Sequence, residues 1–207
     1  MAEANRLTPK QEARRRRVIE AAAQLASEGG YDAVQMRDVA TRADVALGTV
    51  YRYFSSKDQL LVECLWQVAH QLQQDLAGRP PKGESTADRV VEVIRRATRA
   101  LEADPKVASA LVTALASLSS EDPAGLESAQ AVYAIVSDMF TEAMDGGDHP
   151  DREAVIRTLG HVWLAALITW VRGWSTKNEM WRDLEAAVRL LLPAGEKATR
   201  SLAKARA

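Results

Sequence analysis

The chain has 207 residues, of which 47% are hydrophobic, and a formal net charge of −1 at pH 7. This composition is enough for the packed core of one or two domains and argues against a disordered protein. The near-zero net charge argues against a protein that coats nucleic acid along its whole length.

The single cysteine, Cys64, cannot form an intramolecular disulfide, which fits a reducing cytoplasm. The first residues are polar and do not have the pattern of a signal peptide. The nearest approach to an apolar run, residues 163–171, is shorter than the ~18 residues that a membrane span needs. We therefore expect a cytoplasmic protein that does not enter a membrane.

Charge is distributed unevenly along the chain. Lys10 is followed by a basic block of Arg14, Arg15, Arg16 and Arg17, and residues 6–57 contain ten Lys or Arg against six Asp or Glu. This local excess permits contact with DNA phosphates, although a run of arginines is more often a solvated face.

Hydrophobic residues recur at helical spacing nearly throughout the chain, without sustained period-two alternation. Thr8 and Gln11 are spaced as a capping box around Pro9, and a Gly-Gly pair at 29–30 ends the first helix. Two short helices are predicted at residues 36–42 and 46–54. A long helix then runs from the serines at 55–56 to about residue 76.

Five more helices are predicted in the rest of the chain. A linker at residues 78–83 precedes a helix over 85–103, and Asp-Pro pairs at 104–105 and 122–123 each begin another. The second of these ends at the glycines 146–147. A helix over 151–174 follows, and a capping box at 176–179 begins the last helix, which ends at Pro193. The tail at 194–207 is expected to be flexible.

Residues 36–54 have the build of a helix-turn-helix, in which a three-residue turn at 43–45 joins two short helices. Val39, Ala40, Val50 and Phe54 are predicted to face inward. The outward set combines small residues, which permit close approach to a DNA groove, with donors for bases and phosphates. These residues are Ala46, Leu47, Gly48, Thr49, Tyr51, Arg52 and Tyr53.

Three of the candidate contacts have a specific physical argument. Gly48 in the middle of a helix costs about 1 kcal/mol relative to alanine, and close approach to DNA is one reason to keep it. Arg52 can reach a guanine edge or a phosphate, and Lys57 begins the next helix, where a phosphate would also meet backbone amides. The alternative is an ordinary helical hairpin with packed tyrosines. The coincidence of hairpin, tyrosines and basic block within the first 60 residues favours DNA binding.

These residues resemble the DNA-binding domain of the TetR family of bacterial regulators over about residues 14–62. The resemblance is carried by the runs GYDAV at 30–34, RDVA at 37–40, ADVALGTVYRYF at 43–54 and SK at 56–57. It implies an all-α homodimer of about nine helices that binds a palindromic DNA operator. In it, residues 8–58 form the helix-turn-helix domain and residues 59–193 form the ligand-binding and dimerisation domain.

The resemblance also implies roles for single residues. Thr49, Tyr51, Tyr53 and Lys57 occupy positions at which the family contacts DNA. Gly48 matches the family's close-approach glycine, and Arg37 matches a phosphate contact. Arg14 and the arginines that follow it are further candidate phosphate contacts. Gln35 departs from the family, which usually has a serine or threonine cap there.

A narrower resemblance, within this family, is to the actinobacterial repressors of cholesterol (steroid) catabolism. It is carried by GGYDAVQMR at 29–37, ADVALGTVYRYF at 43–54, VWL at 162–164 and AVRLL at 187–191. Those repressors are relieved by steroid-derived acyl-CoA thioesters. The resemblance therefore implies a repressor that a small apolar effector releases from DNA.

The helix predicted at 151–174 is apolar on nearly every face, which is typical of a helix buried on all sides. A second subunit is the simplest cover, with the last helix completing a four-helix interface, and the alternative is the central helix of a monomer. The predicted dimer interface consists of Val155, Leu159, Val162, Val171, Leu184, Val188 and Leu191.

A ligand pocket is predicted among the fifth to eighth helices. Its predicted lining is Leu101, Val107, Leu111, Leu115, Tyr133, Phe140, Trp163, Leu167 and Trp170. His161 is either a polar anchor for a ligand or a core histidine, and the second interpretation is favoured.

No cofactor or metal is predicted, because His70 and His149 share no ligand spacing with cysteine or acidic residues. Two other functional classes remain. A small helical enzyme is disfavoured because the chain has no phosphate-binding glycine loop and no nucleophile elbow. A sequence-independent architectural DNA binder is disfavoured by the near-neutral charge.

Overall fold

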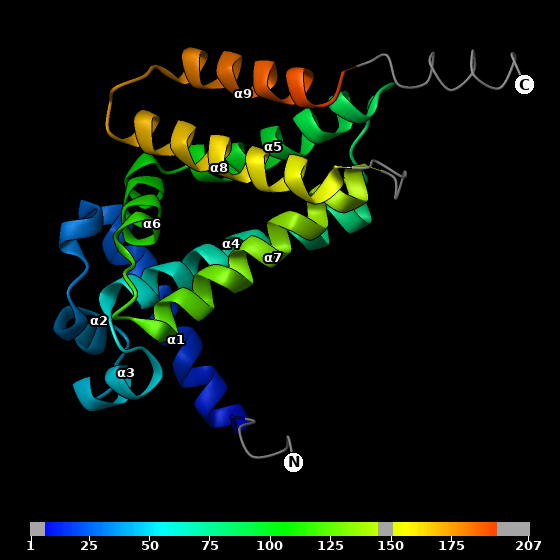
Figure 1. The fold of residues 1–207 in the computed structure, drawn as a ribbon. Coiled ribbons are helices and arrows are strands. Elements are labelled where there is room, and N and C mark those ends of the chain that lie inside the picture. The colour runs from blue at the N-terminus through cyan, green and yellow to red at the C-terminus, as the bar shows by residue number, and fades with distance from the viewer. Residues whose placement is uncertain (1–6, 145–150, 194–207) are drawn as a thin grey trace, which may run out of the picture. The chain divides into compact units, whose positions relative to one another are not determined.

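A computed structural model describes residues 7–144 and 151–193 of the chain. The glycines at 146–147, His149 and the tail at 194–207 lie outside the described residues. Within them, the structure has nine α-helices, one short 3-10 helix and no strand, which confirms the predicted all-α class. The helices are grouped in two compact units, and three of them contribute residues to both (Figure 1).

The first unit consists of Met1–Val68 and Leu101–Val132. It contains α1 (Pro9–Gly29), the 3-10 helix η1 (Tyr31–Ala33), α2 (Met36–Arg42), α3 (Leu47–Tyr53) and the first half of α4 (Lys57–Gly78). It also contains α6 (Pro105–Ser117) and the first part of α7 (Pro123–Ala143). Helix α1 packs against α2, η1 and α6, and α2 packs against α3. The centre of this core is fully buried and includes Val18, Ile19, Phe54, Leu60, Leu61 and Leu111.

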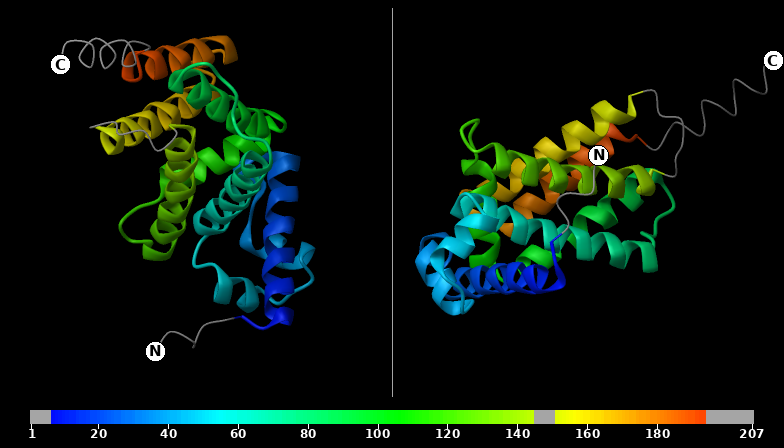
Figure 2. Two further views of the ribbon diagram at one scale, coloured as in Figure 1. Left: turned by 90° about the vertical axis from the view of Figure 1, so that its right-hand side faces the viewer. Right: turned by 90° about the horizontal axis from the view of Figure 1, so that it is seen from below.

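The second unit consists of Ala69–Ala100 and Tyr133–Ala207. It contains most of α5 (Thr86–Glu102), the end of α4 and the end of α7, together with α8 (Arg152–Val171) and α9 (Lys177–Leu191). Helices α8 and α9 lie side by side in all three ribbon views (Figures 1 and 2). Leu159 on α8 and Met180, Leu184 and Val188 on α9 are buried.

Helix ends follow the local signals in the sequence. Thr8 and Thr176 both form complete capping boxes, with Gln11 and Glu179 respectively, as predicted. Asp104 caps α6 by accepting hydrogen bonds from the two backbone amides at 106 and 107. Such caps satisfy amide donors that have no partner inside the helix, which is why they locate helix starts so well.

Two helix ends and one short element differ most clearly from the predictions. Helix α7 ends at Ala143 rather than at the glycines 146–147, and α8 ends at Val171 rather than at residue 174. The backbone of Gly173 has φ of 72°, a left-handed conformation that stops a helix and that glycine adopts readily. The 3-10 helix η1 was not predicted, because a single three-residue turn leaves no periodic pattern.

Candidate DNA-binding surface

The turn between α2 and α3 is tight and is held by its own backbone. Asp44 adopts a left-handed conformation with φ of 51°, which short polar side chains tolerate better than most. Ala43 is buried, and its carbonyl oxygen accepts a hydrogen bond from Nε of Arg17 at 3.2 Å. A side chain of helix α1 therefore stabilises the turn that precedes α3.

Helix α3 is anchored at two points and open elsewhere. Val50 is the one buried residue of its seven, and Phe54, which follows the helix, is 1% exposed. The predicted inward residues Val39, Ala40, Val50 and Phe54 are all buried, which confirms that part of the prediction. Tyr51 is 53% exposed. Its neighbours on the outer face are exposed or half-buried: Ala46, Leu47, Gly48, Thr49, Arg52 and Tyr53.

Packing inside the chain does not require a glycine at residue 48. A Cβ atom added at this residue would have no neighbouring atom within 4 Å, and its φ is not in the left-handed region. The protein's own packing therefore gives no reason for a glycine in this helix. The bare backbone leaves an open approach on the exposed side of α3, as the close-approach prediction requires.

Two neighbouring side chains at the end of α3 interact with each other. The guanidinium carbon of Arg52 lies 5.3 Å from the centroid of the Tyr53 ring, within the range of a cation–π contact. The Tyr53 hydroxyl is buried and has no hydrogen-bond partner among the described residues. Contact between the Tyr53 hydroxyl and DNA would therefore require the side chain to turn outward, whereas Arg52 is already exposed.

Lys57 is the first residue of α4, and its ammonium group lies over an aromatic ring. Its Nζ atom is 3.6 Å from the centroid of the Tyr31 ring and donates a hydrogen bond of 3.3 Å to the Tyr31 carbonyl oxygen. The Tyr31 hydroxyl donates to Asp58 at 2.6 Å. Burial, assisted by the hydrogen bond to Asp58 and the charge of that carboxylate, raises the pKa of Tyr31 to about 12. Tyr31 thus orients the lysine at the helix start.

The basic block on α1 divides into different roles. Arg15 pairs with Glu63 of α4, and its guanidinium carbon lies 5.2 Å from the Phe54 ring centroid. Arg17 bonds the turn, as described above. Arg16 and Glu20 are exposed and 3.6 Å apart, a surface pair of the kind that contributes little stability. Arg15 and Arg17 are therefore structural parts of the head, a role that their spacing alone did not indicate.

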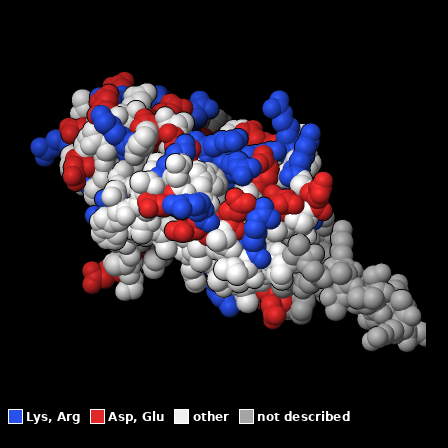
Figure 3. All heavy atoms as spheres, turned by 90° about the horizontal axis from the view of Figure 1, so that it is seen from above, with Lys and Arg blue, Asp and Glu red and all other residues white. Residues whose placement is uncertain are grey.

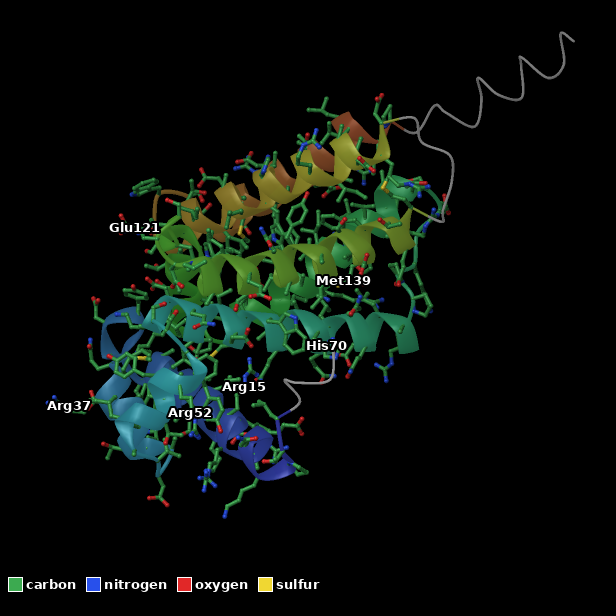
Figure 4. All side chains as sticks on the ribbon, turned by 60° about the horizontal axis from the view of Figure 1, so that its bottom comes forward. Arg15, Arg37, Arg52, His70, Glu121 and Met139 are labelled. Carbon is green, nitrogen blue, oxygen red and sulfur yellow. The ribbon has the colours of Figure 1, made fainter. Side chains whose placement is uncertain are left out.

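Arg37 on α2 is exposed and extends from the helix into solvent (Figure 4). The residue before the helix, Gln35, makes no side-chain cap, because its amide instead donates to the Asp32 carbonyl oxygen at 2.9 Å. The departure noted at Gln35 is thus real: α2 begins without a side-chain cap. Its start is held by the buried Met36 and by packing against α1 and α3.

The predicted pocket residues are found in both units. Leu101, Val107, Leu111 and Leu115 belong to the first unit, and the other five belong to the second. In the second unit, the Phe140 and Trp163 ring centroids are 6.2 Å apart, and the buried indole N–H of Trp163 donates to the Thr98 hydroxyl at 3.1 Å. Leu167 is also buried, Trp170 is half-buried and Tyr133 is 45% exposed.

The predicted interface residues also separate into two groups. Val155, Leu159, Leu184 and Val188 are buried inside the chain, whereas Val162, Val171 and Leu191 are half-buried. His161 is exposed, so its interpretation as a core histidine is wrong. By helical periodicity it lies opposite the buried Trp163. Among the described residues, no cluster of histidine, cysteine and acidic side chains could hold a metal.

Helix α8 also has the length and composition of a membrane span when all 20 of its residues are counted, although residues 163–171 alone are too few. This is weak support for a membrane, since helices of soluble proteins meet the same criterion. Only 33% of its most apolar window is buried inside the chain, so the predicted burial on all sides requires cover from outside this chain.

An exposed α3 with hydroxyl and guanidinium groups, held by a tight turn on a three-helix head, defines a helix-turn-helix DNA-binding protein. The family model of bacterial regulatory proteins of the tetR family matches residues 18–64, and that of the tetracycline repressor-like C-terminal domain matches residues 83–191. The chain belongs to the TetR family and is a DNA-binding transcriptional regulator.

The narrower resemblance is confirmed by relatives of nearly the same length. The chain is 38% identical to the HTH-type transcriptional repressor KstR of Rhodococcus jostii over 90% of this chain and 86% of that protein. A crystal structure of a TetR transcriptional regulator from Rhodococcus sp. RHA1 has 30% identity and a TM-score of 0.77, over 89% of this chain and 98% of that one. FadR of Bacillus subtilis shares the fold at 20% identity, with a TM-score of 0.62 over 86% of this chain and 97% of that one.

Proposed function

We propose that this ligand-responsive transcriptional repressor acts as a cytoplasmic homodimer that a CoA thioester of a large apolar acid releases from a palindromic operator. The observation that carries the proposal is the similarity to KstR along nearly the whole chain, which extends through the second unit and not only the DNA-binding head. The FadR structure named above is a complex with stearoyl-CoA, an acyl-CoA ligand in a protein of the same fold.

The second unit offers apolar and aromatic side chains suited to such an effector. Phe140, Trp163 and Leu167 come from α7 and α8, and a buried polar pair, Trp163 and Thr98, lies among them. Ligand sites combine an apolar lining with a few placed polar groups. Because α4, α5 and α7 each belong to both units, a rearrangement in the second unit has three direct covalent routes to the first unit, which contains the head.

Dimerisation is proposed through the exposed face of α8 and the adjoining side of α9. This face includes Ala165 and the half-buried Leu164, Ile168 and Val171, while Trp174 and Leu190 nearby are 77% and 81% exposed. Apolar surface of this kind usually marks an interface. The residues that pack inside the chain, such as Leu159 and Val188, would support this face rather than touch the partner.

Two other functional classes have less support. The formal net charge of −1 is unlike the strongly basic balance of a protein that binds DNA regardless of sequence, and the one face seen in Figure 3 carries interspersed basic and acidic side chains. The curated relative KstR is named as a repressor of transcription, and we propose no enzymatic activity for this chain.

The test uses the wild-type chain and a DNA duplex that it selects from a randomised library. We expect a saturating concentration of a cholesterol-derived or long-chain acyl-CoA to weaken binding to that duplex by about 5–150-fold, the usual range of allosteric coupling. Free CoA and the free acid serve as controls. Binding that no acyl-CoA alters would refute the effector class, while failure to enrich any duplex would refute sequence-specific DNA binding.

A further inference from the structure

Two serines lie between α3, the helix that faces DNA and is here called the recognition helix, and α4. Both form hydrogen bonds to the residue that precedes α7. Asp122 is the residue before α7, and its carboxylate accepts a hydrogen bond from the Ser55 hydroxyl at 3.1 Å and from the Ser56 hydroxyl at 2.6 Å. Ser55 and Ser56 are the only residues between Phe54, which directly follows α3, and Lys57, which begins α4. One carboxylate therefore holds the whole α3–α4 connection.

The Asp122 carboxylate also caps α7, and the Ser56 hydroxyl, which donates to it, caps α4. Oδ1 of Asp122 accepts a hydrogen bond from the backbone N–H of Gly125 at 2.9 Å, and the Ser56 hydroxyl accepts one from the backbone N–H of Gln59 at 3.0 Å. Two helix N-termini thus meet at one negative charge, which both helix dipoles favour. The hydrogen bond from Ser56 is the main reason why the pKa of Asp122 lies below its usual value.

The first turn of α7 is shaped around this carboxylate. A Cβ atom on Gly125 would lie 2.8 Å from Oδ2 of Asp122 and 2.5 Å from a methyl group of Leu118. Any larger residue at this position would displace the carboxylate, the leucine or both. Glycine is therefore the residue that allows Asp122 to serve both helices.

A second set of contacts ties α7 to the same connection by a different path. The Ser128 hydroxyl, which is buried, donates to Glu63 at 2.9 Å, and Glu63 pairs with Arg15. Arg15 in turn covers the ring of Phe54. Both paths join the first two turns of α7 to residues 54–56.

We infer that Asp122 is a positioning residue for DNA binding: through Ser55 and Ser56 it holds α3 and Lys57 in the orientation that meets the duplex. Asp122 itself lies after the recognition helix by more than 60 residues and needs no contact with DNA to act in this way. The inference rests on the assigned DNA binding but not on the proposed effector or dimer surface.

The main test is Asp122→Ser, which keeps a hydroxyl for capping α7 but removes the carboxylate that bonds both serines. We expect about tenfold weaker binding to the duplex selected by the wild-type protein, the scale of a charged hydrogen bond. Binding to a random duplex at the same salt should weaken by clearly less than tenfold, because the phosphate contacts other than that of Lys57 do not depend on Asp122. A loss of overall stability alone would leave the ratio of the two affinities unchanged.

Asp104→Ser is the matched control. Asp104 caps α6 and also bonds a serine, Ser27 of α1, but has no link to the α3–α4 connection. An equal loss of the affinity ratio in Asp104→Ser would overturn the inference, and so would an unchanged ratio in Asp122→Ser.

Two further variants cover the case in which Asp122→Ser does not fold. Ser55→Ala removes a hydroxyl that bonds Asp122 and Gln59 side chains and caps no backbone amide. Gly125→Ala keeps Asp122 but crowds its carboxylate. We expect both to lower the affinity ratio in the same direction, and wild-type ratios in both would refute the positioning role.

Discussion

Helices α3 and α8 both leave most of their surface uncovered by their own chain, but with opposite chemistry. One of the seven residues of α3 is buried, and its open side carries hydroxyl and guanidinium groups. Five of the 20 residues of α8 are buried. The N-terminal half of its open side carries polar residues such as the exposed Arg157 and His161, and the C-terminal half carries Ala165 with the half-buried Leu164 and Ile168. The polar surface of α3 is stable in water without a partner, whereas apolar surface such as that of the C-terminal half of α8 gains free energy when it is covered.

This difference fits the two proposed partners, DNA at α3, which binds reversibly, and a second subunit at α8, which stays bound. DNA must be released for regulation, so the surface that meets it has to tolerate exposure between binding events. An apolar helix face gains free energy whenever it is covered, which suits a subunit that stays bound. The following variants test this contrast, starting with the largest expected effect.

Ala165→Arg places a charge on the exposed side of α8, where it should prevent a second chain from docking. We expect a folded monomer whose affinity for the selected duplex falls by roughly 100-fold or more, since joining two binding modules gains ~10²–10⁴. Light scattering after size exclusion and a binding titration measure the two effects.

Ala100→Arg is the matched control for this variant. It adds the same guanidinium at an exposed position of α5, outside the proposed interface, and should leave the dimer intact. A dimeric Ala165→Arg chain would show that α8 meets its partner elsewhere or not at all.

Arg52→Ala tests base recognition by α3. Removal of a base contact should cost about 1–3 kcal/mol on the selected duplex and relax the preference at one position of the site. Arg37→Ala is the comparison: a phosphate contact should weaken binding to all sequences alike and reduce the salt slope by about 1. Identical selection profiles for Arg52→Ala and the wild type would show that Arg52 does not recognise a base.

Gly48→Ala should separate stability from DNA binding. The added methyl group meets open space in the protein, so the free energy of unfolding should rise by up to about 1 kcal/mol through helix propensity. The same methyl group should hinder the approach of α3 to the groove and weaken binding to the selected duplex. Gly78→Ala, another helical position with open space, serves as the control without effect on DNA. Stronger or equal DNA binding by Gly48→Ala would contradict the close-approach role.

Tyr31→Phe should have the smallest effect: loss of the hydrogen bond to Asp58 should cost about 1 kcal/mol at neutral pH, and the change in pH dependence should appear only in alkali. The folded pKa of Tyr31 is raised to about 12 from an ordinary 10, so the unfolded chain ionises first as pH rises. The stability that this shift contributes is present below pH 10 and falls away between about pH 10 and 12. Tyr31→Phe should flatten the decline of unfolding free energy over that window. A decline as steep as that of the wild type would assign the alkaline loss to other groups.

Local signals in the sequence were sufficient for the helical fold. The capping boxes at Thr8 and Thr176 and the Asp-Pro starts of α6 and α7 are formed by residues at most three positions apart, so their pattern is readable without any tertiary contact. The helix-turn-helix was predictable for the same reason, since its inward and outward residues follow the period of a helix.

Contacts between distant residues were decided only by the tertiary structure. Periodicity states which side of a helix is apolar but not what covers it, so Val155 and Leu184 were assigned to a partner although this chain buries them. Likewise, the sequence showed Asp122 only as a helix start, and its bonds to Ser55 and Ser56 join residues more than 60 positions apart. Such pairs form because folding brings separate helices together, and no local pattern encodes which side chains will then face each other.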